Sequence, residues 1–160
     1  MKLVCLDIDG VLNNDESTKT DSKTGSSVGL KPGFAALDPA CIARVAKICE
    51  LTGAKILITT SWRKYYTQDE LVTIFKHHGL TAEVVGFTPV FRSRERGDEI
   101  KAWFKTHRLS GGEAIKSFVI LDDDDDMGSL FPYLVKTGEF GLLDQHVEVA
   151  VRILNAPPFL

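Results

Sequence analysis

The sequence predicts an α/β fold: a doubly wound, Rossmann-like parallel sheet of about five strands with helices on both faces. Two observations support this fold class. Short apolar segments of strand length alternate along the chain with longer segments whose apolar residues recur at helical spacing. Several of the apolar segments also end in polar or acidic residues, as strands do at the ligand-binding edge of an open parallel sheet.

The predicted strands are the short apolar segments. The first, at residues 3–6, has the unbroken apolar character of a strand buried on both faces. Asp7, Asp9 and Gly10 follow it, so two carboxylates stand at its carboxyl end just before a residue that lets the backbone turn sharply. Further strands are expected at residues 55–60, 81–87, 118–121 and 133–136.

Helices are predicted between these strands from apolar spacing and from end signals. Asp38 followed by Pro39 is a strong helix start, and Gly53 supplies the end of that helix. Thr67 and Glu70 form a capping-box pattern before the next helix. The last two helices are expected at residues 98–107 and 144–155.

Length and composition predict a single domain over residues 1–160. The chain is 44% apolar, which is enough for a sizeable core, and its formal net charge of −3 does not indicate a general polyanion binder. Three cysteines, without metal-ligand spacing, indicate small buried hydrophobes in a reducing compartment. No signal peptide or membrane-spanning segment is evident. We therefore expect a cytoplasmic protein without a membrane partner; the sequence does not indicate an oligomeric state.

Residues 13–37 differ from the rest of the chain because they are polar and carry few apolar residues. This composition predicts an excursion from the sheet, either a flap or mobile loop beside the site or a surface loop without a role. The gaps between the predicted elements leave no room for a large inserted domain. The site is therefore expected to be open.

Acidic residues suggest the chemistry. Asp7 and Asp9 are so close in sequence that their carboxylates repel unless a cation or a shared proton compensates them. A run of five acids, residues 122–126, follows another predicted strand. Carboxylates at one sheet edge suit Mg²⁺, which prefers hard oxygen ligands, although a run of acids is also typical of a solvated loop. The residues therefore favour a magnesium-dependent phosphoryl-transfer site.

Residues 7–12, Asp-Ile-Asp-Gly-Val-Leu, resemble the opening motif of the haloacid dehalogenase-like (HAD) phosphatase superfamily. Groups at the ends of later strands follow in the order of that superfamily's other motifs: Thr60-Ser61-Trp62-Arg63, Arg96-Gly97-Asp98-Glu99 and Leu121-Asp122-Asp123. The pattern is similar to small capless HAD domains found alone or beside nucleic-acid repair modules. The resemblance covers residues 3 to about 154.

The resemblance implies a role for each group. Asp7 is implied as the nucleophile that forms an aspartyl-phosphate, and Asp9 as the general acid. A hydroxyl of the second group would bind a phosphate oxygen; Ser61 is preferred, with Thr60 the close alternative. Residue type and position, rather than the resemblance, suggest roles for the next two residues. Arg63 is expected to bind a phosphate or carboxylate of the substrate, with a solvated side chain as the alternative, whereas Trp62 either stacks on a ring or, as we favour, covers the sheet edge.

The remaining implied residues balance charge and bind metal. Arg96 matches the superfamily's basic position, with Arg94 as the substitute and as a substrate-binding residue; Gly10 completes the substrate-binding set. Asp122 fits the first acid of the last motif, and Asp123 or Asp126 the second. The implied Mg²⁺ ligands are Asp7, Asp9, Asp122, Asp123 and Asp126.

These observations predict a Mg²⁺-dependent phosphomonoester hydrolase. Its partner is a phosphorylated substrate, either a nucleic-acid end or a small molecule such as a nucleotide. The basic run around residues 92–108 and Trp62 mildly favour a nucleic-acid end, although nearby acids offset the charge. The alternative is a catalytically weak phosphate-binding or regulatory module with the same fold. Dehalogenation is disfavoured because it needs no magnesium, and so gives Asp9 and the acidic run no role.

Overall fold

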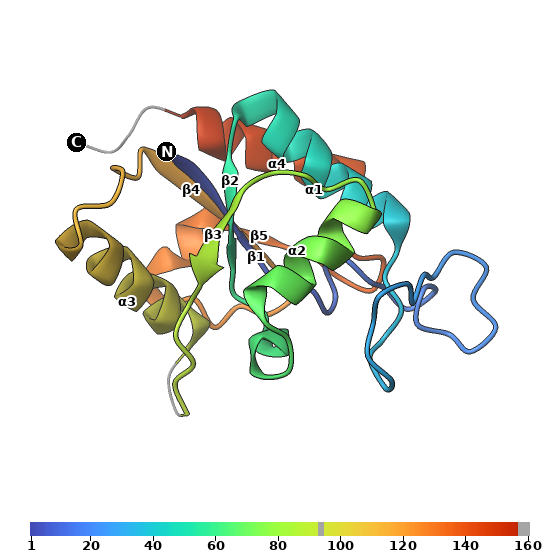
Figure 1. Ribbon diagram of the computed structural model, residues 1–160. Helices are drawn as coiled ribbons and strands as arrows, with labels where there is room; N and C mark the ends of the chain where they lie inside the picture. Colours follow the sequence, from blue (N-terminus) through green and yellow to red (C-terminus); the bar gives the residue numbers. More distant parts are fainter. Residues whose placement is uncertain (93–94, 157–160) are drawn as a thin grey trace.

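The computed structural model of the protein describes residues 1–92 and 95–156 (Figure 1). Its centre is a parallel sheet of five strands in the order β3-β2-β1-β4-β5, which confirms the predicted fold class. Within the described residues no cap domain is inserted between these elements. The strands are β1 (Lys2–Leu6), β2 (Lys55–Ile58), β3 (Val84–Phe87), β4 (Ser117–Asp122) and β5 (Leu134–Lys136).

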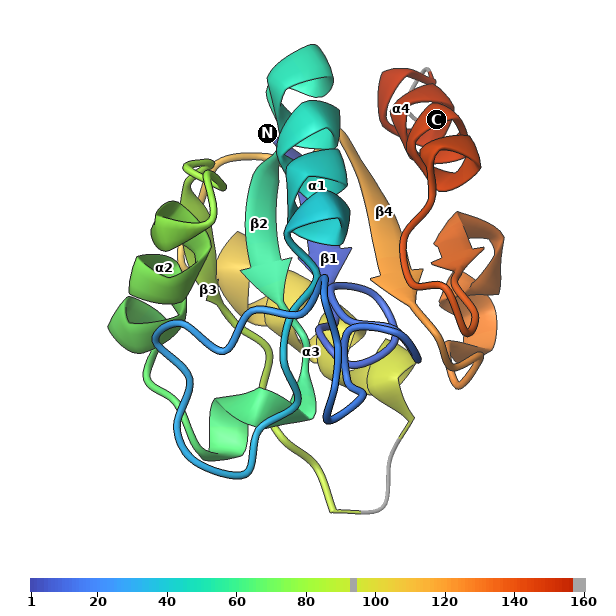
Figure 2. The same cartoon turned by 90° about the vertical axis from the view of Figure 1, so that its right-hand side faces the viewer.

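Helices cover both faces of the sheet (Figure 2). Apolar residues of α1 (Pro39–Thr52), α2 (Gln68–His77) and α4 (Asp144–Asn155) form the larger core cluster on one face. On the other face, α3 (Arg96–Leu109) contributes Ile100 to a smaller cluster. Two short 3₁₀ helices, η1 (Ser61–Lys64) and η2 (Gly128–Tyr133), follow β2 and β4.

The position of β1 at the centre of the sheet explains why its sequence is apolar throughout instead of alternating between apolar and polar residues. Successive side chains of a strand point to opposite faces, and both faces of this sheet are covered. Val4 and Leu6 therefore belong to the larger cluster, whereas Cys5 belongs to the smaller one. All three cysteines are free and buried, as the sequence predicts.

The helix starts follow the sequence signals. The Asp38 carboxylate accepts a hydrogen bond from the backbone N–H of Ala40 at the start of α1. Gly53 ends this helix in the left-handed conformation, with a φ of 71°. Thr67 Oγ1 accepts from the N–H of Glu70, as the capping-box pattern predicts.

Two element bounds differ from the prediction in a way that affects the site. Strand β2 ends at Ile58, so Thr59 and Thr60 lie beyond the strand. Helix α3 begins at Arg96, two residues before the expected start at residue 98, and backbone groups of Asp126 and Met127 pack against its first turn. Arg96 thereby occupies the helix N-terminus at the carboxyl edge of the sheet.

The segment 13–37 is an excursion between β1 and α1, in front of the carboxyl ends of the strands in Figure 2. It is irregular apart from an isolated antiparallel bridge between Ser26 and Leu37. Two residues of the segment contact η1 and the turn that follows it: the Phe34 ring packs edge-on against Trp62 in η1, and the N–H of Lys31 donates to the hydroxyl of Tyr66, two residues after η1, at 2.8 Å. None of the described helices is both long and apolar enough to span a membrane.

We expect Gly97→Ala to lower the free energy of unfolding by about 1–3 kcal/mol, because overpacking a close contact forces the backbone to shift. A Cβ at Gly97 would overlap the carbonyl oxygen of Met127. Gly138→Ala is the matched control, since a Cβ there meets nothing within 4 Å, and it should change stability by less than about 0.5 kcal/mol. Denaturant unfolding measures both; equal effects would contradict the packing of α3 on residue 127.

Candidate active site

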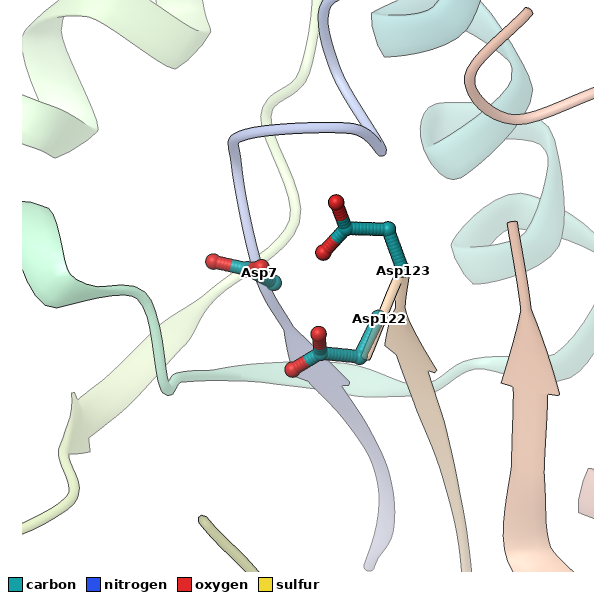
Figure 3. Close-up of side chains that lie close together, drawn as sticks. All are labelled: Asp7, Asp122 and Asp123. Carbon is teal, nitrogen blue, oxygen red and sulfur yellow. The ribbon is translucent and has the colours of Figure 1, made fainter. Parts of the chain in front are cut away.

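The site is built at the ends of two adjacent strands. In β1 and β4, Leu6 pairs with Leu121, so the next residues of each strand, Asp7 and Asp122, lie beside one another at the carboxyl edge. The N–H of Asp7 donates to the Leu121 carbonyl at 3.0 Å, which fixes this register. One carboxylate oxygen from each of Asp7, Asp122 and Asp123 lies within 4.8 Å of the others (Figure 3).

Burial removes water from these acids and so disfavours their charged, carboxylate forms. Asp7 is 6% exposed and Asp122 is 1% exposed, whereas Asp123 is exposed. Burial, with the nearby Asp7 carboxylate, raises the pKa of Asp122 to about 8. Burial also raises the pKa of Asp7, although Arg96 opposes this effect. The arrangement therefore favours any cation that can lie among the three carboxylates.

Arg96 supplies part of that positive charge. Its Nη1 lies 3.5 Å from Asp7 Oδ1 and 3.6 Å from Asp122 Oδ2, and it also donates to the Thr59 carbonyl. The guanidinium reaches these groups from the first residue of α3. The structure thus places Arg96 where the sequence resemblance expects the basic group of the site.

Asp123, rather than Asp126, completes the acidic cluster. The Asp126 carboxylate instead accepts a hydrogen bond from the N–H of Arg96 at 3.1 Å, at the start of α3. A carboxylate is stabilised at a helix N-terminus by the free N–H groups there. The sequence left these two acids as alternatives, and the turn after β4 separates them: Asp123 faces the site, and Asp126 faces the helix.

Gly10 allows Asp123 to approach. Its φ is 76°, in the left-handed region, and a Cβ at this position would overlap the Asp123 carboxylate. The Thr137 hydroxyl donates to the Gly10 carbonyl at 2.6 Å and holds the turn from the side of β5. Gly10 therefore shapes the site through its backbone.

Thr60, rather than Ser61, adjoins Asp7. The Thr60 side chain is fully buried, and its hydrogen bond to the Asp7 carboxyl lowers the pKa of that group. Ser61 is exposed at the start of η1. The preference for Ser61 assumed a strand that continues to residue 60, but β2 ends at Ile58, so the second residue after the strand faces the site.

The Arg63 side chain is buried and bonds to other residues of the protein, instead of facing a ligand. Its side chain is 3% exposed, and Nη2 lies 2.9 Å from Glu99 Oε2. Nε donates to the Thr60 carbonyl and Nη1 to the Thr88 carbonyl, each at 2.7 Å. All three guanidinium nitrogens are therefore engaged inside the protein. The expectation of a substrate ligand rested on the residue type and its place after the strand, which do not reveal a buried partner such as Glu99.

Two residues near Asp9 were not assigned to the site from sequence. Trp62 Nε1 donates to Asp9 Oδ2, and Asn13 Nδ2 donates to Asp9 Oδ1, each at 3.0 Å. The Asp9 side chain, expected among the metal ligands, is therefore turned toward these donors and is not part of the three-carboxylate cluster. Arg94, the proposed substitute for Arg96, lies outside the described residues.

The acidic cluster fits a small divalent cation. Its donors are carboxylate oxygens, which Mg²⁺ prefers. Asp122 Oδ2 is buried and, within residues 1–92 and 95–156, accepts no hydrogen bond; the Arg96 guanidinium at 3.6 Å is its ionic neighbour, and the oxygen can still accept a further cationic partner. The residues that could hold the ion are Asp7, Asp122 and Asp123. A polar pocket of about 380 Å³ adjoins them and shares Gly10 and Asp123 with the site.

A comparison with known protein families matches residues 3–147 to the family described as "HAD domain in Swiss Army Knife RNA repair proteins". The fold and the site thus define a HAD domain, as the motifs predicted. In particular, the chain belongs to this family of HAD domains from RNA repair proteins. A search of curated proteins finds no match.

We expect Mg²⁺ to raise the melting temperature of the protein, because an ion bound only by the folded state stabilises it, by about 2.7 kcal/mol at a hundredfold excess over Kd. Asp122→Asn should remove most of this increase, since it takes one charged oxygen donor from the cluster. Asp124→Asn, at an exposed position outside the cluster, is the control. A thermal melt with and without Mg²⁺ measures the effect; equal increases in both variants would contradict the site.

Arg63→Met should lower the free energy of unfolding by about 3–5 kcal/mol, because it leaves the buried Glu99 carboxylate unpaired. The double variant Arg63→Met/Glu99→Leu removes both charges and should recover much of that loss. Denaturant unfolding checks both variants. A variant with full stability but weaker substrate binding would instead support the original ligand role.

Proposed function

We propose that this protein is a Mg²⁺-dependent phosphomonoester hydrolase that acts through an aspartyl-phosphate on Asp7. The observation that carries the proposal is the convergence of Asp7, Asp122 and Asp123 with the Arg96 guanidinium at one sheet edge. Membership of the family of HAD domains from RNA repair proteins supports a phosphatase-type reaction on a phosphate at an RNA end.

In the first step, a carboxylate oxygen of Asp7 attacks phosphorus and forms the O–P bond while the bond to the leaving oxygen breaks. Asp9 gives its proton to that oxygen. Arg96 and the Thr60 hydroxyl lie beside Asp7, where they can stabilise charge on the nucleophile and on the phosphoryl oxygens. Bound to the three carboxylates, Mg²⁺ would neutralise phosphate charge and let the anionic substrate approach the acidic site.

In the second step, water attacks phosphorus and the Asp7 O–P bond breaks. The water proton passes to Asp9, inorganic phosphate leaves, and both aspartates return to their starting states. Asp9 suits this exchange because it is exposed, whereas Asp7 is buried. The two neighbouring carboxylates thus have separate roles that follow from their surroundings.

Asp7→Asn should abolish Mg²⁺-dependent phosphate release, because an amide oxygen is a poor nucleophile and the step has no substitute group. Phosphate release is measured from para-nitrophenyl phosphate and from an oligoribonucleotide with a terminal phosphate, with Mg²⁺ and with a chelator. Asp124→Asn serves as the control with an unchanged site. Retained release in Asp7→Asn would disprove the mechanism. Tight phosphate binding without turnover in the wild type would favour a phosphate-binding module.

An RNA-end substrate should have a kcat/KM at least about tenfold higher than the matching nucleoside monophosphate, because contacts beyond the terminal nucleotide add binding energy that can be used in the transition state. Turnover of the oligonucleotide should also fall with rising salt, as phosphate contacts release counterions. Steady-state kinetics at two salt concentrations test both points. Equal efficiency and no salt dependence would indicate a small-molecule substrate.

A further inference from the structure

Both carboxylate oxygens of Asp9 are held by N–H donors from other parts of the chain. Trp62 Nε1 binds Oδ2 and Asn13 Nδ2 binds Oδ1, each at 3.0 Å. Asn13 Oδ1 in turn accepts from the N–H of Gly10 at 2.8 Å, which determines the direction in which its Nδ2 points. Since each carboxylate oxygen has two lone pairs, one on each oxygen remains for a proton or a water molecule.

These hydrogen bonds, rather than packing, fix the orientation of the Asp9 side chain. Asp9 is exposed, so its side chain is not confined by neighbouring apolar groups. Trp62 and Asn13, in contrast, are 3% and 4% exposed, and their own positions are fixed by the surrounding protein. An exposed carboxylate is thus oriented by two buried side chains.

Trp62 is held within an aromatic cluster that includes the excursion. Its ring stacks on Tyr66 with centroids 5.5 Å apart, and Phe34 packs edge-on against it at 4.9 Å. Phe34 belongs to residues 13–37, and the N–H of Lys31 in the same segment donates to the Tyr66 hydroxyl. The excursion therefore reaches Asp9 twice, directly through its first residue, Asn13, and indirectly through Phe34 and Trp62.

We propose that Trp62 and Asn13 are positioning residues that hold the Asp9 carboxyl in the orientation needed for proton transfer to the leaving oxygen, with residues 31–34 of the excursion seating Trp62. This inference rests on the proposed function. It assigns the excursion a role in catalysis that does not require it to close over the site. It also explains why a tryptophan, with a single N–H donor on a large ring, stands after β2.

The test compares two leaving groups. Trp62→Phe keeps a ring in the cluster but removes the N–H that holds Asp9. We expect it to lower kcat/KM for an oligoribonucleotide terminal phosphate by about tenfold, a part of the roughly 10²- to 10⁴-fold that general acid–base catalysis contributes. For para-nitrophenyl phosphate, whose leaving group departs without a proton, we expect a change of less than about twofold. The parameter kcat/KM is chosen because it includes formation of the aspartyl-phosphate but not its hydrolysis.

Two further variants separate positioning from folding. Tyr65→Phe keeps the ring that packs against Phe34 and changes neither a donor to Asp9 nor the Tyr66 hydroxyl, so kcat/KM for both substrates should be unchanged. Asn13→Ala removes the donor to Asp9 without placing a second carboxylate beside it, and the Thr137 hydroxyl still holds the Gly10 carbonyl, so this variant should reproduce the leaving-group dependence of Trp62→Phe. This second variant carries the test if Trp62→Phe does not fold, which a thermal melt reveals.

A double-mutant cycle gives the decisive result. In an Asp9→Asn background, adding Trp62→Phe should cause no further loss with the oligonucleotide, because residues that act through one group are not additive. Equal losses with both substrates, or a full additional loss in that background, would overturn the positioning role. If the wild type releases no phosphate from either substrate, or Asp7→Asn retains release, the proposed function itself fails and this inference fails with it.

Discussion

The structure of the site depends on one electrostatic constraint, the repulsion between carboxylates that the sheet forces together. Asp7 and Asp122 follow paired residues of neighbouring parallel strands, so the backbone leaves them no freedom to separate. Burial raises the pKa of both groups, and Arg96 lies within 3.6 Å of each. The guanidinium offsets only part of the negative charge of three acids. The remaining charge suits a divalent cation and, with it, a phosphate.

The placement of Arg96 is itself a consequence of how α3 begins. The Asp126 carboxylate accepts from the N–H of Arg96, and Gly97 lets the first turn of the helix approach residue 127 closely. The acidic run therefore has two structural roles, since Asp122 and Asp123 face the cluster and Asp126 fixes the helix that carries its counter-charge. Arg63 and Glu99 pair nearby inside the protein and attach η1 to α3. At the start of α3, Glu99 therefore belongs to the scaffold, whereas Arg96 faces the site.

The two aspartates of the first motif differ in their surroundings more than in their position along the chain. Asp7 is buried beside Arg96 and Thr60, which stabilise its carboxylate, the form that acts as a nucleophile. Asp9 is exposed and held by neutral N–H donors, which suits a group that exchanges protons with a leaving oxygen and with water. The aromatic cluster joins this second aspartate to the excursion. A chain with no cap domain among its described residues thus still brings a distant segment to the site.

The sequence by itself determined the parallel α/β sheet, because unbroken apolar strands and capped helices are local signals. It placed Asp7 and Asp122 together because residues at the carboxyl ends of parallel strands meet at one edge, whereas Arg96 was expected there only from the family resemblance. The tertiary structure decided whatever depends on the direction of a side chain. It chose Asp123 over Asp126 and Thr60 over Ser61, since the exact ends of β2 and α3 set which residue faces inward. It also placed Arg63 against Glu99 and Asp9 against Trp62, because hydrogen-bond partners far apart in sequence are selected only when the chain is packed.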